Sequence, residues 1–155
     1  MRKRTKRKVV PVRIDTMAFV KAGLVKVADL PKTGTFLQLM TYESLDEVVK
    51  GNPSNDHVDD LITVANMCEH LAYKHKIGDE YMELINQAQD DIYEMATKGV
   101  SGKAFRFTGA GLENVRAMLE LYSEQLKMAN VKQMEETIDS VQQVYQHKRG
   151  RVIKP

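Results

Sequence analysis

Residues 55–76 read NDHVDDLITVANMCEHLAYKHK, and their apolar positions recur every three or four residues. This spacing places the apolar side chains on one face of an α-helix. The face consists of Val58, Leu61, Ile62, Ala65, Cys68 and Ala72. The acidic residues of the segment fall in the first turns, where a helix favours carboxylates, or on the outer face. They are Asp56, Asp59, Asp60 and Glu69. The segment therefore predicts an amphipathic helix that buries one face against other helices.

A second amphipathic helix is predicted before this one. Thr33 or Thr35 can begin it, and Gly51 supplies a left-handed stop after Lys50. Its expected buried residues are Phe36, Leu37, Met40, Leu45, Val48 and Val49. Further upstream, we expect a short helix from residue 15 or 16 to residue 23, followed by a connector at residues 25–32.

A third helix is predicted directly after residues 55–76. Gly78 ends the earlier helix, and Asp79 can cap a helix that extends to about Gly99. Its apolar positions are Tyr81, Leu84, Ile85, Ala88, Ile92 and Met95. Because the connection is short, the two helices are expected to form an antiparallel hairpin.

Two more helices are predicted in the C-terminal third of the sequence. Residues 99–111 form the longest irregular segment, and an apolar face then follows at Leu112, Val115, Leu119, Tyr122 and Leu126. Asn130 and Gln133 resemble a capping box, which predicts a further helix with Met134, Ile138, Val141 and Tyr145 buried. A strand at residues 104–108 is the alternative, but it would have no sure partner. We therefore predict an all-α fold, a five- or six-helix bundle with basic, flexible N- and C-terminal segments.

Length and composition are those of one folded domain. A chain of 155 residues can bury a continuous apolar core without disulfides or a structural metal. The lone Cys68 cannot form an internal disulfide, which fits a reducing compartment. The sequence has no apolar run near 18 residues and no secretory signal pattern. We therefore expect a cytoplasmic protein that neither spans a membrane nor is exported.

Charge is segregated along the chain. Residues 1–13 hold seven cations and residues 148–155 hold four, with no acid in either segment. Residues 14–147 hold the other 12 cations and all 21 acids, a formal net charge of −9. This pattern divides the chain into a basic arm (1–13), an acidic helical domain (14–147) and a basic tail (148–155).

The basic ends have the composition that neutralises phosphates, so we expect them to contact nucleic acid or an acidic partner. The residues concerned are Arg2, Lys3, Arg4, Lys6, Arg7, Lys8, Arg13, Lys148, Arg149 and Arg151. The alternative is a solvated tail, or an arm that folds back on the acidic body.

The acidic body is suited to a basic protein surface, including one that normally holds nucleic acid. The candidate residues for protein binding are Asp56, Asp59, Asp60, Asp90, Asp91, Phe105, Arg106 and Phe107. The two phenylalanines flank a cation and could fill a partner's pocket or stack on a base. The alternative is that the acids are an ordinary solvated surface and that the rings pack over the end of the bundle.

No motif of catalytic or cofactor chemistry is complete. Gly102-Lys103 resembles the end of a Walker loop, but Ala104 stands where Ser or Thr would bind magnesium. His70 and His75 are five residues apart, so we expect them not to share a helical face as an i, i+4 zinc pair does. We therefore predict a protein that is not an enzyme and has no metal, cofactor or small-molecule substrate.

A diffuse resemblance covers most of the chain. The residues that carry it are Met1-Arg2-Lys3-Arg4, Asn66, Glu69, Leu71-Ala72, Gly78, Ala88-Gln89, Tyr122 and Gln125-Leu126. In these the chain resembles small accessory proteins of proteobacterial prophages and mobile elements, a group that includes anti-CRISPR proteins. The resemblance implies a context in which such proteins regulate nucleic-acid transactions or inhibit host defence. Within that context we expect a non-enzymatic inhibitor that binds a host protein or nucleoprotein complex. The alternative function is a DNA-binding transcriptional or replication regulator of such an element.

Overall fold

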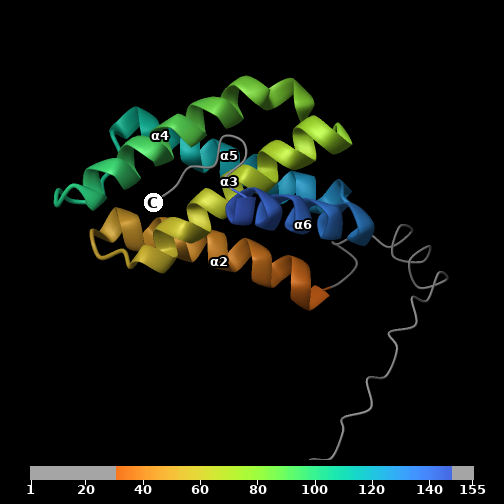
Figure 1. Ribbon diagram of the computed structural model, residues 1–155, viewed down its shortest axis with the longest axis horizontal. Coiled ribbons are helices and arrows are strands. Elements are labelled where there is room, and N and C mark those ends of the chain that lie inside the picture. The colour runs from red at the N-terminus through yellow and green to blue at the C-terminus, as the bar shows by residue number, and fades with distance from the viewer. Residues whose placement is uncertain (1–30, 148–155) are drawn as a thin grey trace, which may run out of the picture.

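A computed structural model describes residues 31–147 of the protein, and these residues form an all-α bundle (Figure 1). The elements are α2 (Pro31–Lys50), α3 (Asn55–His75), the 3₁₀ helix η2 (Asp79–Tyr81), α4 (Met82–Val100), α5 (Gly109–Met128) and α6 (Val131–His147). Residues 31–147 contain no strand, so the expected all-helical class is confirmed and the alternative strand at 104–108 is wrong. The short helix expected near residues 15–23, the basic arm and the basic tail lie outside the described residues.

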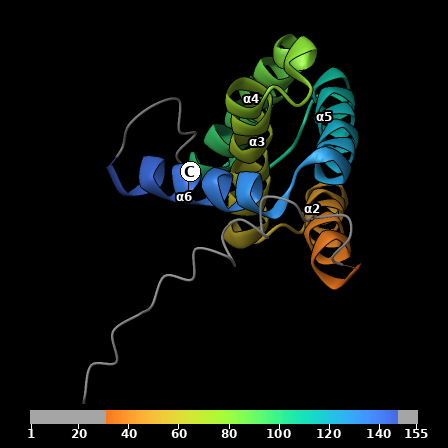
Figure 2. The same cartoon turned by 90° about the vertical axis from the view of Figure 1, so that its right-hand side faces the viewer.

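The helix predicted from residues 55–76 is the centre of the bundle. α3 contacts α2, α4, α5 and α6, and Figure 2 shows it enclosed among these helices. All six residues of its predicted apolar face are buried. Since full burial of one Leu or Ile side chain contributes about 1.5–3 kcal/mol, α3 accounts for much of the hydrophobic stabilisation.

Two capping boxes set the beginnings of helices. At α3, the Ser54 backbone N–H donates to His57 Nδ1 at 3.0 Å, and His57 N–H donates to Ser54 Oγ at 3.4 Å. At α6, Asn130 N–H donates to Gln133 Oε1 at 3.0 Å, and Gln133 N–H donates to Asn130 Oδ1 at 2.8 Å. The capping box expected at Asn130 is therefore confirmed, and it separates α5 from α6.

Several predicted helix ends are wrong by a few residues. α2 begins at Pro31, inside the expected connector, because proline is favourable in the first helical turn, where an N–H would lack a partner. α4 begins at Met82 and not at Asp79, because η2 occupies residues 79–81. The irregular segment is 101–108 and not 99–111, since the flanking glycines extend α4 and α5.

Some positions of the predicted apolar faces are not buried. Val49 is 49% exposed, Tyr81 is 48% exposed and Ile138 is 37% exposed, while Met40, Leu84 and Leu112 are only half-buried. α2 buries Thr41 and Ser44 together with Leu45 and Val48, so its buried face is rotated from the expected one. The side chains of Phe36, Leu37 and Tyr145 lie outside those that the structure describes.

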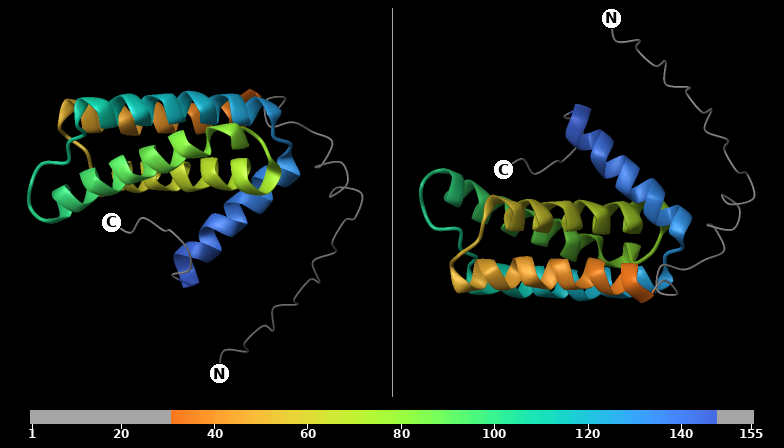
Figure 3. Two further views of the ribbon diagram at one scale, coloured as in Figure 1. Left: turned by 90° about the horizontal axis from the view of Figure 1, so that it is seen from above. Right: turned by 90° about the horizontal axis from the view of Figure 1, so that it is seen from below.

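The bundle has two distinct ends, and α6 crosses it at an angle (Figure 3). At the hairpin end, α3 passes into α4, α2 begins and α5 ends. At the opposite loop end lie the connection from α2 to α3 and residues 101–108. Within residues 31–147, no helix combines the length and apolar character needed to cross a bilayer.

Candidate protein-binding groove

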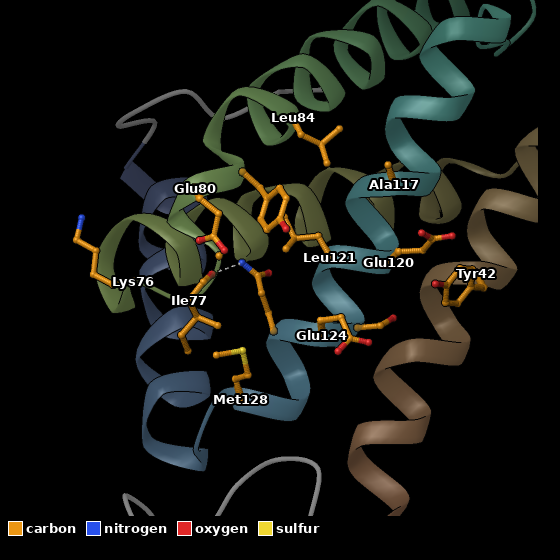
Figure 4. Close-up of a pocket in the computed structure, with 14 residues that line it drawn as sticks. Tyr42, Lys76, Ile77, Glu80, Leu84, Ala117, Glu120, Leu121, Glu124 and Met128 are labelled. Atoms are coloured by element: carbon orange, nitrogen blue, oxygen red, sulfur yellow. Dashed lines mark hydrogen bonds between the residues drawn. The ribbon is translucent and has the colours of Figure 1, made fainter.

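An open groove with a volume of about 780 Å³ lies at the hairpin end. α5 forms its floor, the turn from α3 into α4 forms one wall, and Tyr42 of α2 lies on the other side (Figure 4). The lining residues from the turn and from the first turn of α4 are Lys76, Ile77, Gly78, Glu80, Tyr81 and Leu84. Those from α5 are Ala117, Glu120, Leu121, Ser123, Glu124, Gln125 and Met128. The groove therefore depends on three parts of the chain that are distant in sequence.

The turn that forms the wall needs two left-handed residues. Lys76 has a φ of 57° and Gly78 has a φ of 79°. A Cβ atom on Gly78 would lie 3.0 Å from Leu121 Cδ1 of α5, closer than ordinary van der Waals contact. Glycine thus serves two purposes here, since it adopts the left-handed conformation without strain and lets the turn approach α5.

Gln125 joins the wall to the floor. Its side chain is 1% exposed, and Nε2 donates hydrogen bonds to the carbonyl oxygens of Ile77, at 2.8 Å, and Cys68, at 3.1 Å. Its Oε1 atom is buried and accepts no hydrogen bond from the described part of the chain. Because hydrogen bonds to buried carbonyls are costly to lose, Gln125 holds the α3–α4 turn in a defined position on α5.

Negative charge dominates the rim of the groove. Glu80, Glu120 and Glu124 are exposed, and Lys76 is the one cation among the lining residues. Lys127 lies next to the rim and forms an ion pair with Glu124 at 2.6 Å, but both side chains are well exposed. Such surface pairs are worth about 0–1 kcal/mol, so a partner's cation can readily take the place of Lys127.

Apolar side chains remain exposed between these acids. Met128 is 62% exposed, Tyr81 is 48% exposed and Tyr42 is 42% exposed. Tyrosine and methionine are common at protein interfaces, because they offer apolar area together with a polar tip or a flexible chain. The chemistry of the groove therefore fits a segment that presents an apolar side chain flanked by cations.

The predicted Phe105-Arg106-Phe107 segment lies at the loop end. Phe105 and Phe107 are half-buried and pack against the core, while Arg106 is exposed. Phe105 covers Gly99 so closely that a Cβ atom there would lie 1.9 Å from Phe105 Cδ1. The two rings thus pack over the bundle end, and their contact with a partner stays a prediction.

Two of the three candidate acids at the start of α3, Asp59 and Asp60, are partly buried. Asp60 accepts a hydrogen bond from Ser44 Oγ of α2 at 2.8 Å. Burial raises the pKa of Asp59, and the neighbouring carboxylates of Asp56 and Asp60 raise this pKa further. Asp56 itself is exposed. These acids lie at the opposite end of the bundle from the groove, so the structure does not join them to it.

The two candidate acids of α4, Asp90 and Asp91, also differ in exposure: Asp91 is half-buried and Asp90 is exposed. Asp91 accepts a hydrogen bond from Asn114 Nδ2 at 2.8 Å and therefore holds the first turns of α5 against α4. Of this pair, only Asp90 presents a carboxylate without a described structural role.

The expectation that His70 and His75 do not share a face is wrong. Their ring centroids are 5.4 Å apart in an edge-to-face contact, because both rings lie on the side of α3 that α6 covers. His70 Nδ1 lies 3.0 Å from Thr137 Oγ1, and His75 Nε2 lies 3.6 Å from Glu136 Oε2. Burial lowers the pKa of His70 and the pKa of His75. Among residues 31–147, no three His, Cys, Asp or Glu side chains are placed to hold a metal ion.

The only cysteine is enclosed by the core. Cys68 is fully buried on α3, and burial raises the pKa of its thiol to about 12. The thiol is therefore protonated at neutral pH, and a protonated, enclosed thiol is a poor nucleophile.

Sequence reasoning did not identify the groove. Its clearest signal in the sequence is the pair Glu120 and Glu124, one helical turn apart, beside Leu121. Comparisons with protein-family models, curated proteins and solved structures find no match to the chain.

Proposed function

We propose that the protein is a non-enzymatic binding protein whose groove holds a basic, partly apolar segment of a partner protein. The observation that carries the proposal is the groove at the hairpin end, where Glu80, Glu120 and Glu124 surround exposed apolar side chains. Charges of opposite sign across an interface favour the correct partner and speed association.

The specific form that we propose is an antagonist of a host nucleoprotein complex, such as a CRISPR effector. Protein surfaces that hold nucleic acid are basic, and an acidic surface competes for them. Residues 31–147 carry 19 acids against 10 cations, a formal net charge of −9. This negative charge supports attraction of the helical body to a basic protein surface. The resemblance to accessory proteins of mobile elements supplies the host context.

The test is retention of host proteins on the immobilised full-length chain, after nuclease treatment of the lysate. The groove variant replaces Glu80, Glu120 and Glu124 with glutamine. The matched control has the same change in charge at exposed acids that do not line the groove, Glu113→Gln, Glu135→Gln and Asp139→Asn.

The proposal expects the groove variant to lose affinity and the control to keep it. Three rim charges at about 0.2–1 kcal/mol each amount to a loss of roughly 3- to 150-fold. Equal losses in both variants would show attraction by net charge alone and contradict the groove. Retention of no host protein, together with sequence-preferring binding of the purified chain to naked duplex, would favour the DNA-binding regulator instead.

A further inference from the structure

We propose that the basic arm of the same chain, residues 1–13, occupies the groove when no partner is bound. The inference rests on the groove being a surface for basic segments, as proposed above. The arm then acts as a built-in competitor that a partner must displace.

The chemistry of the arm matches that of the groove. Residues 1–13 contain seven cations and no acid, and three valines lie between Lys8 and Arg13. The groove offers the reverse pattern, with three exposed glutamates around the apolar side chains of Leu121 and Met128. A valine can therefore enter the apolar floor while cations on both sides of it meet the acidic rim.

Chain length allows the arm to reach the groove. α2 begins at the hairpin end, which is the end that holds the groove (Figure 3). The 17 residues from 14 to 30 join the arm to α2. With the helix expected at residues 15–23 contributing about 14 Å and the other eight residues up to about 28 Å, they span up to about 40 Å. A helix of 20 residues such as α2 is only about 30 Å long, so the linker exceeds the distances within the bundle.

The basic tail is the less suitable occupant. α6 has 17 residues and carries the chain about 25 Å from the point where α5 ends. The eight residues that follow, 148–155, must cover this distance again, and extended they span at most about 28 Å. The tail also has four cations where the arm has seven.

Tethering makes even a weak contact effective. A segment that belongs to the same chain is presented to the groove at an effective concentration on the order of 1 mM, so a contact with a Kd of about 1 mM would be about half occupied. A partner then meets only the fraction of molecules with a free groove, and its apparent affinity falls in proportion.

The experiment is zero-length carbodiimide cross-linking of the purified full-length chain, which joins lysine amines to carboxylates in contact. The arm offers Lys3, Lys6 and Lys8. We expect cross-links from these lysines to Glu80, Glu120 and Glu124 at several-fold higher yield than to Glu113, Glu135 and Asp139. An equimolar mixture of ¹⁴N- and ¹⁵N-labelled chains distinguishes links within one chain from links between copies.

A matched variant removes charge from the arm and keeps its reactive amines. The changes Arg2→Gln, Arg4→Gln and Arg7→Gln should lower the yield at the groove glutamates by several-fold. Equal yields at groove and control acids, no effect of this variant, or links mainly between differently labelled chains would each overturn the proposal.

The result is independent of partner capture. The cross-linking assay contains no partner, so a failure of the proposed function in the lysate experiment does not alter it. If both proposals hold, the arginine variant should retain the partner up to about twofold more tightly than the wild type, because its groove is more often free.

Discussion

Replacing Gln125 with leucine tests the contact that forms the groove. The change keeps the side-chain size but removes the hydrogen bonds from Nε2 to the carbonyl oxygens of Ile77 and Cys68. Each lost bond costs about 1 kcal/mol, and a buried carbonyl left without a donor adds about 1 kcal/mol or more. The Gln125 Oε1 atom is buried without a hydrogen-bond partner in the described part of the chain, so its removal is favourable and offsets part of this loss. The expected net loss in the free energy of unfolding is about 2 kcal/mol.

The assays are urea and thermal denaturation, each followed by far-UV circular dichroism, with hydrogen exchange at residues 76–81. At roughly 2–4 °C per kcal/mol for a chain of this size, the melting temperature should fall by about 4–8 °C. Exchange in the turn should accelerate more than exchange in the middle of α3, since the turn loses its attachment to α5. The control is Gln87→Leu at an exposed position of α4, which should change stability by less than about 0.5 kcal/mol. A Gln125 variant as stable as this control would refute the reasoning.

Three further predictions concern other parts of the bundle. Gly78→Ala should cost about 1–2 kcal/mol in urea denaturation, because alanine is strained at a φ of 79°. Gly99→Ala should destabilise by about 1–3 kcal/mol and raise proteolysis in residues 101–108, because the new Cβ displaces Phe105. The double variant of His70 and His75 to glutamine should show a smaller loss of stability between pH 7.5 and pH 5.5 than the wild type. Burial lowers the pKa of both histidines below the ordinary 6.5, so the unfolded state takes up protons first. The contribution of the two neutral histidines to the free energy of unfolding is complete above about pH 6.5, and it is lost as the pH falls through their lowered pKa values.

Controls separate these effects from general ones. Gly102→Ala has a comparable φ of 88°, but its Cβ would meet no atom within 4 Å. Gly78→Ala should therefore be the more harmful of the two, and equal losses would show that the approach to Leu121 costs nothing. For the histidines, parallel pH curves for the wild type and the double variant would contradict a role for the α3–α6 contact.

The helices could be predicted because their signals are local. The apolar face of residues 55–76 is buried at every predicted position, and the Asn130–Gln133 capping box forms as expected. Both patterns depend on residues within one or two turns of each other, where backbone geometry alone decides which side chains meet.

Burial at the margins of a helix could not be predicted in the same way. Val48 and Val49 are equally apolar neighbours, yet Val48 is buried and Val49 faces solvent. Periodicity predicts that a face exists, but the rotation and width of the buried part depend on the helices that pack against it. The contact between His70 and His75 was missed for the same reason, since it forms under α6.

The amino-acid sequence alone determined the helical class, the acidic body and the concentration of cations at both ends, because composition and periodicity act over a few residues. Only the tertiary structure decided where an acidic apolar groove lies. It brings Tyr42, Gly78 and Glu120 together from α2, the α3–α4 turn and α5. No local pattern joins them, because their proximity follows from how α3 packs against its neighbours and from the hydrogen bonds of Gln125.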